Sequence, residues 1–160
     1  MAQSMDSKKM LSSLQELLHI DIDAVVLYDA ALRIISHPMA EQALMEFRSD
    51  HLRHIREIND CIEQLGGERA CIEVNAEQCD LHGFTPIEEG MPLDAVFMAM
   101  VDGEQITNET YERILKQEWT PEIRSLIDRN FVDEQRHLLW VLKASRTRMW
   151  EQDTGERPGV

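Results

Sequence analysis

The sequence lacks any apolar run long enough to cross a bilayer, because charged residues recur throughout its 160 residues. The first ten residues are polar and contain no apolar core of the kind that secretory signals carry. These absences predict a cytoplasmic protein with no membrane partner.

Basic residues are scarce: 16 Lys and Arg stand against 30 Asp and Glu, which gives a formal net charge of −14. A nucleic-acid partner requires a basic surface, so binding to nucleic acid is not expected. Cysteine is scarce as well. The three cysteines are odd in number and have no C-x-x-C spacing, which favours reduced thiols over a disulfide framework.

Glycine and proline are few, and they separate four segments in which apolar residues recur every three or four positions. This spacing is typical of helices that bury one face. Tight breaks occur at residues 36–38 and 118–121, whereas residues 68 to about 90 lose the periodicity and form a long connector. The sequence therefore predicts an all-α four-helix bundle, made of two helix hairpins joined by a long crossover. The expected domain limits are a flexible N-terminus at 1–8, the bundle at 9–150 and a flexible tail at 151–160.

Two runs share the pattern D-x-x-R-H, one from Asp50 to His54 and one from Asp133 to His137, 83 residues later. Amphipathic helices repeat their apolar residues but have no reason to repeat Tyr, Arg and His in register. The shared spacing predicts an internal repeat of one helix-hairpin unit, with chance similarity of two helix pairs as the alternative. Other residues related by the same spacing are Asp21 with Glu104, Tyr28 with Tyr111, and Pro38 with Pro121.

Acids and imidazoles stand in the middle of each apolar stripe, where a carboxylate is costly unless it is paired or bound to a metal ion. Helices of similar length would bring these central positions to one height in the bundle. Carboxylate and imidazole together are ligands for iron, manganese or zinc rather than for calcium or magnesium. The sequence predicts a buried metal centre, and a bundle without metal is the alternative. The candidate ligands are Asp21, His51, His54, Glu104, Glu134 and His137.

Further polar residues flank these candidates. A carboxylate one position before a ligand points to the side of the metal, where it can accept the free N–H of a ligating histidine. An arginine can pair with such a carboxylate, and a tyrosine two turns beyond an acid can reach a carboxylate on a neighbouring helix. For the tyrosines, ordinary core packing is the alternative. These supporting candidates are Asp50, Asp133, Arg53, Arg136, Tyr28 and Tyr111.

Two asparagines, Asn108 and Asn130, lie one turn from Glu104 and Glu134. They are expected either to line a small polar pocket or to bond to backbone groups.

The pattern resembles the ferritin-like superfamily of di-iron carboxylate bundles, which includes ferritins, rubrerythrins and ribonucleotide reductase small subunits. The resemblance covers nearly all of residues 9–150. The run from Asp133 to His137 matches the D-E-x-R-H form of di-iron oxygenases, and Glu104-x6-Tyr111 resembles rubrerythrin helices. In length the chain resembles small stand-alone bacterial ferritin-like proteins of unassigned function.

The resemblance implies a centre of two iron ions. Asp21 and Glu104 would be terminal ligands, Glu134 a bridge, and His54 and His137 one nitrogen ligand each. His51 departs from the family, because it stands where the second bridging glutamate is found. A hydroxide, an external anion or Asp50 would then complete the site, and a single-metal site is the alternative.

By the same resemblance the chain would be a di-iron oxidoreductase that reacts with oxygen or peroxide. The alternative is a non-catalytic metal-binding or scaffold bundle that holds zinc or one metal ion, and manganese also suits the ligands. Assembly into a homodimer or a larger homo-oligomer is left open.

Overall fold

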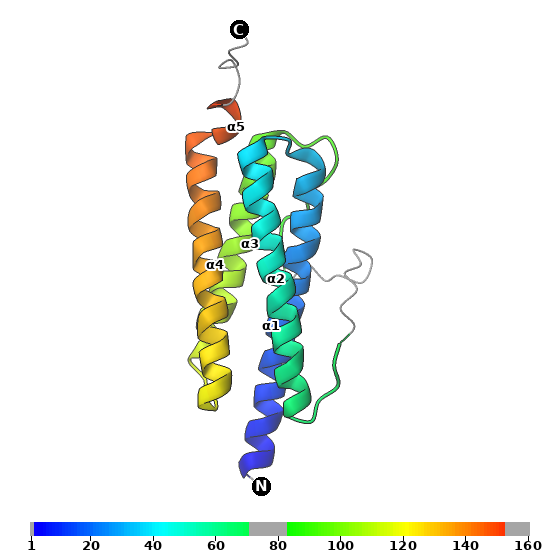
Figure 1. Ribbon diagram of the computed structural model, residues 1–160, viewed down its shortest axis with the longest axis vertical. Helices are drawn as coiled ribbons and strands as arrows, with labels where there is room; N and C mark the ends of the chain where they lie inside the picture. Colours follow the sequence, from blue (N-terminus) through cyan, green and yellow to red (C-terminus); the bar gives the residue numbers. More distant parts are fainter. Residues whose placement is uncertain (1, 71–82, 153–160) are drawn as a thin grey trace.

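The computed structural model describes residues 2–70 and 83–152, and these residues form four long helices and one short helix with no strand among them. The prediction of an all-α four-helix bundle is confirmed. Figure 1 shows the four long helices packed side by side along one axis. Their bounds are α1 Ala2–Ile34, α2 Pro38–Gln64, α3 Leu93–Leu115 and α4 Pro121–Thr147, followed by α5 Met149–Gln152.

Both hairpins turn at a proline that occupies the first helical position, where its missing N–H leaves no hydrogen bond unmade. The residue before each proline caps the new helix. His37 accepts a hydrogen bond at Nδ1 from the backbone N–H of Ala40, and the Thr120 hydroxyl accepts one from the N–H of Ile123. The breaks predicted at residues 36–38 and 118–121 are therefore confirmed as tight helix-to-helix turns.

The two hairpins are joined by the long connector between α2 and α3. It starts at Leu65 and Gly66, where Gly66 has a φ of 87°, and its last described part runs from Gly83 to Pro92. Figure 1 shows α3 beginning at the end of the bundle where α2 began, so α2 and α3 run in the same direction. This order brings residues from all four long helices together in the interior of the bundle.

Apolar side chains fill both ends of the bundle interior. Buried leucine and isoleucine dominate the end nearest the chain start, and Phe47 and Phe97 are buried elsewhere in the core. The two tyrosines, Tyr28 and Tyr111, are fully buried. A layer of charged and imidazole side chains is buried within this core, and it forms the candidate site described below.

The ends of the chain differ from the predicted domain limits. α1 begins at Ala2, so the helix includes residues 2–8, which the sequence pattern assigned to a flexible N-terminus. The flexibility of either end stays a prediction, and residues 153–160 of the predicted tail lie outside the described residues. Within the described ranges, no helix has the length and apolar character that a membrane crossing requires.

Cys61 is a buried free thiol. Cys71 and Cys79 lie outside the described residues.

Candidate metal centre

The structure brings together all six residues that the sequence singled out as candidate ligands. Asp21 comes from α1, His51 and His54 from α2, Glu104 from α3, and Glu134 and His137 from α4. Glu104 is 2% exposed and the other five are fully buried, so water solvates almost none of their polar atoms. A buried group of this kind requires internal charge compensation. Their role as ligands stays a proposal.

Two overlapping sets of four residues have ligand atoms within 4.8 Å of one another. The first set contains Asp21 and His54, the second contains Glu104 and His137, and both contain His51 and Glu134. The carboxylate of Glu134 lies between the sets: Oε1 is 3.0 Å from His54 Nδ1, and Oε2 is 3.4 Å from His137 Nδ1. Each oxygen of Glu134 therefore faces a different set.

Several atoms at the centre make no well-oriented hydrogen bond although they are buried. They belong to four of the six residues, and buried polar atoms without a partner are uncommon in proteins. Nitrogen and oxygen lone pairs that converge without protein partners fit a metal ion, which needs several such atoms around one point. The atoms are His51 Nε2, Glu104 Oε1, Glu134 Oε1, Glu134 Oε2 and His137 Nδ1.

The two tyrosines hold Asp21 and Glu104 by hydrogen bonds that cross between α1 and α3. The Tyr111 hydroxyl donates to Asp21 Oδ2 at 2.6 Å, and the Tyr28 hydroxyl donates to Glu104 Oε2. Burial raises the pKa of both hydroxyls well above 10. The nearby charge of Glu104 raises that of Tyr28 further, and the charge of Asp21 does the same for Tyr111. Both hydroxyls therefore stay protonated donors.

His54 and His137 are each oriented by an aspartate from the opposite helix. His54 Nε2 lies 2.9 Å from Asp133 Oδ2, and His137 Nε2 lies 2.8 Å from Asp50 Oδ2. In both histidines Nδ1 points inward to the candidate ligands. An outward acceptor of this kind fixes the ring and its tautomer.

Arg53 and Arg136 join these two aspartates into a ring of ion pairs across α2 and α4. Arg53 contacts Asp133 and lies 3.2 Å from Asp50, while Arg136 lies 2.7 Å from Asp50 and 3.3 Å from Asp133. Burial would raise the pKa of Asp50, but the hydrogen bond with His137 and the charges of His137 and Arg136 lower it to about 2. The pKa of Asp133 is lowered for the same kind of reason, through His54. Both side chains are therefore carboxylates at neutral pH.

Protons on the three histidines balance the three buried acids when no metal is bound. Burial alone would lower the pKa of His51 and His54. The charge of Glu134 raises that of His51 to about 10, and the charge of Asp21 raises that of His54 to about 12. The pKa of His137 is raised as well, through its hydrogen bond with Asp50 and the nearby charge of Glu134. The centre thus attracts positive charge strongly.

The two asparagines behave differently from each other. Asn108 donates from Nδ2 to the backbone carbonyls of Glu104 and Glu134, so it ties α3 to α4 beside the centre. Asn130 is buried, its Nδ2 makes no well-oriented hydrogen bond, and the residue is one of those that line a cavity of about 440 Å³ between α2 and α4. Asp133 and Arg53 line the same cavity. Asn108 therefore meets the expectation of backbone bonding, and Asn130 meets the expectation of lining a pocket.

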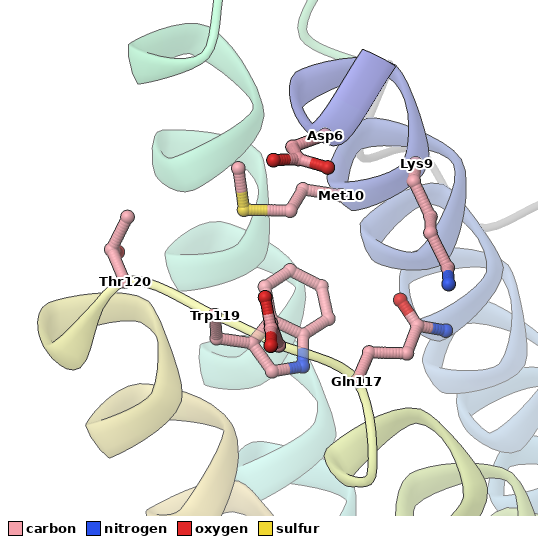
Figure 2. A pocket seen from close by; sticks show the side chains of 7 residues that line it. Asp6, Lys9, Met10, Gln117, Trp119 and Thr120 are labelled. Carbon is pink, nitrogen blue, oxygen red and sulfur yellow. The ribbon is translucent and has the colours of Figure 1, made fainter. Parts of the chain in front are cut away.

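A second cavity, of about 340 Å³, lies between the start of α1 and the turn that joins α3 to α4 (Figure 2). Figure 2 shows the Trp119 ring on its floor, with Met10 and Asp6 approaching from α1. Lys9 and Gln117 complete one side of it. None of the six candidate ligands lines this cavity, so it is separate from the centre.

Comparison with solved structures supplies a neighbour for this fold. The chain is similar to an X-ray structure of the Desulfovibrio desulfuricans bacterioferritin, with a TM-score of 0.74 and 19% sequence identity over 92% of this chain and 84% of that one. The chain has a ferritin-like fold. That structure was described for its di-iron site in different catalytic states, including one reduced in solution and then reoxidised. No protein-family model and no curated protein sequence matches the chain.

The ferritin-like fold confirms the resemblance predicted from the sequence at the level of the fold. Sequence reasoning did not predict that the tyrosine and aspartate contacts would run crosswise between the halves of the chain. It also passed over Asp23, a second acid of α1 that is 2% exposed and next but one to Asp21. The clue was available, because an acid between apolar residues of a buried helix is costly in itself.

Proposed function

We propose that the ferritin-like bundle binds two divalent metal ions, most naturally iron, in the two overlapping sets of ligands. The observation that carries this proposal is the group of buried lone pairs without hydrogen-bond partners at the point where the four helices meet. Asp21 and His54 would hold one ion, and Glu104 and His137 the other. Glu134, with one oxygen facing each set, would link them.

The proposed activity is reaction with dioxygen or peroxide. Bound ferrous iron would supply the electrons for this chemistry. The protein's own part is to keep the terminal acids in place through the two tyrosine hydroxyls, to fix His54 and His137 through Asp133 and Asp50, and to exclude bulk water. The ferritin-like neighbour with a di-iron site that cycles between reduced and reoxidised states supports this choice.

The test compares the wild-type protein with a His54→Ala, His137→Ala double variant, both purified without added metal. We expect iron in the wild type at about two ions per chain, little or none in the double variant, and consumption of oxygen or peroxide by the ferrous wild type alone. Circular dichroism checks that the variant is still helical. A His19→Gln variant is the matched control, because His19 is an exposed histidine of α1 outside the centre.

A second candidate function is a non-catalytic metal site that holds zinc or a single ion. The observation that favours it is His51, an imidazole at the place where ferritin-like di-iron proteins have a second bridging carboxylate. Stoichiometric zinc without turnover in the same experiment would replace the oxidoreductase proposal with this one. Manganese would be recognised by the same elemental analysis.

The assembly state, the cellular location and the internal repeat stay predictions. A homodimer or larger homo-oligomer is compatible with the exposed apolar side chains of Met39, Met45 and Leu139, and sedimentation analysis would determine the assembly state. A cytoplasmic location and an internal repeat are retained from the sequence.

A further inference from the structure

His51 differs from the other two histidines of the centre in what its ring nitrogens face. His54 and His137 each turn Nδ1 inward and give Nε2 to an aspartate outside the centre. His51 has no such outward acceptor among the described residues. Its Nδ1 lies 2.7 Å from Asp21 Oδ1, and its Nε2 lies 3.7 Å from Glu104 Oε2 without a hydrogen bond.

The two nitrogens of His51 therefore face the two different sets of ligands. Nδ1 faces the set of Asp21 and also lies 3.3 Å from Glu134 Oε1, and Nε2 faces the set of Glu104. Neighbouring rings hold this orientation: the Tyr28 ring centroid lies 5.3 Å from that of His51, and the His137 centroid 5.0 Å. A full rotation of the ring would need these packed side chains to move.

We propose that His51 bridges the two metal ions, binding one through Nδ1 and the other through Nε2. This inference rests on the proposed function, because it requires that two ions bind. The first ion takes the lone pair of one ring nitrogen in place of any proton there, which leaves His51 as a neutral imidazole with one N–H proton. When the second ion binds, that N–H bond breaks, its electron pair becomes the second metal bond, and the proton passes to solvent.

The charge of the centre then balances. Three carboxylates contribute three negative charges, and a doubly bound His51, as imidazolate, contributes a fourth. Two divalent ions contribute four positive charges, so the buried centre is neutral. Without the bridge the same centre keeps one positive charge in a dry interior, which is costly unless an external anion enters.

An imidazole bridge also sets the separation of the ions. Each metal–nitrogen bond adds about 2 Å to either side of the ring, which places the ions about 6 Å apart. Two-metal sites without such a ring between the ions hold them about 3.5–4 Å apart. Glu134, which would give one oxygen to each ion, is compatible with either separation. The separation therefore distinguishes the two arrangements.

The test is anomalous diffraction from crystals of the wild-type protein loaded with zinc ions alone. We expect two peaks about 6 Å apart with the His51 ring between them. Two peaks about 3.5–4 Å apart, with His51 bound to one ion only, would overturn the inference and leave the proposed metal binding intact. Absence of any bound ion would overturn the proposed function and the bridge with it.

Two variants extend the test, the first by the same diffraction experiment and the second by a metal titration. His51→Glu places a carboxylate at the position, so we expect two zinc ions at the shorter separation of about 3.5–4 Å. His51→Gln removes the bridge, so we expect the second ion to bind at least about 10-fold more weakly, because loss of a direct ligand costs no less than loss of an outer partner. The exposed His19→Gln variant is the control and should bind as the wild type does. Unchanged affinity for both ions in His51→Gln would count against the bridge.

Discussion

Asp21 and Glu104 are each held by a tyrosine from the other half of the chain. The hydroxyl of Tyr111 donates to Asp21, and the hydroxyl of Tyr28 donates to Glu104. A buried carboxylate with a protonated donor and histidines around it is kept in one position before any metal arrives. At the residue scale, this preorganisation lowers the cost of assembling the ligands.

Tyr111→Phe should weaken the protein and its metal site together. Loss of the hydroxyl leaves one oxygen of buried Asp21 without its donor, so we expect the metal-free protein to lose about 1–3 kcal/mol of unfolding free energy. Affinity for the ion near Asp21 should fall as well. Urea unfolding and a competitive metal titration measure the two effects.

Tyr28→Phe is the matched variant, because Tyr28 bonds Glu104 in the corresponding way. Its effect should be of similar size. A large effect of one substitution beside none of the other would contradict the equivalent roles of the two tyrosines.

Residue types and spacing were enough to predict that six acids and imidazoles would meet in the interior of the bundle, because imidazole and carboxylate at central stripe positions have no ordinary reason to be buried. They were not enough to predict which nitrogen of His51 faces which acid. That depends on ring rotation, which Tyr28 and His137 determine by packing. The pairing of Asp50 with His137 likewise depends on how closely α2 approaches α4.

At the scale of helices, α2 and α4 are linked by charged groups that also touch the centre. Asp50 of α2 accepts from His137 and Arg136 of α4, and Asp133 of α4 accepts from His54 and Arg53 of α2. One ring of ion pairs therefore connects the helices and orients two candidate ligands. The two arginines of this ring reach solvent, which screens their charge, so the main effect of the ring is expected on metal affinity.

Asp133→Asn should reduce metal affinity by about 10–100-fold while leaving the helical fold intact. The amide cannot accept from His54 Nε2 as strongly as the carboxylate, so the ring of His54 is less firmly oriented. A metal titration followed by circular dichroism measures both. Asp128→Asn is the control on the same helix. Asp128 is exposed, and it lies 3.7 Å from Arg124 and away from the centre. Equal affinities in the two variants would contradict the orienting role.

The sequence pattern predicts some helix ends and misses others. Pro38 and Pro121 mark their helix starts because proline suits the first helical position. The start of α1 at Ala2 was missed because residues 2–8 carry no apolar stripe. In Figure 1 this part of α1 extends beyond the end of α2, where a buried face is not needed.

At the scale of the whole molecule, a buried layer of charge interrupts an apolar core. In the metal-free protein the acids keep the histidines protonated, with pKa values of about 10 for His51 and about 12 for His54. An unfolded chain would have histidine pKa values near 6.5. Folding therefore binds protons above that pH, and metal ions compete with them for the same lone pairs.

The stability of the metal-free protein should consequently depend on pH. The stabilisation that a raised histidine pKa gives the folded state is complete below about pH 6.5 and is lost as pH rises toward 10 to 12. We expect the unfolding free energy to fall by at least about 1 kcal/mol per pH unit between pH 7 and 9.5. Urea unfolding across this range measures it. A stability that stays level or rises would contradict the charge balance described here.

An anaerobic titration of the metal-free protein with ferrous iron measures the number of ions that the four helices hold. We predict saturation at two ions per chain and a higher unfolding temperature at saturation, because an ion that binds only the folded state stabilises it. No binding of iron by the wild type, or binding that survives in the His54→Ala, His137→Ala variant, would contradict the assignment of the buried layer as a metal centre.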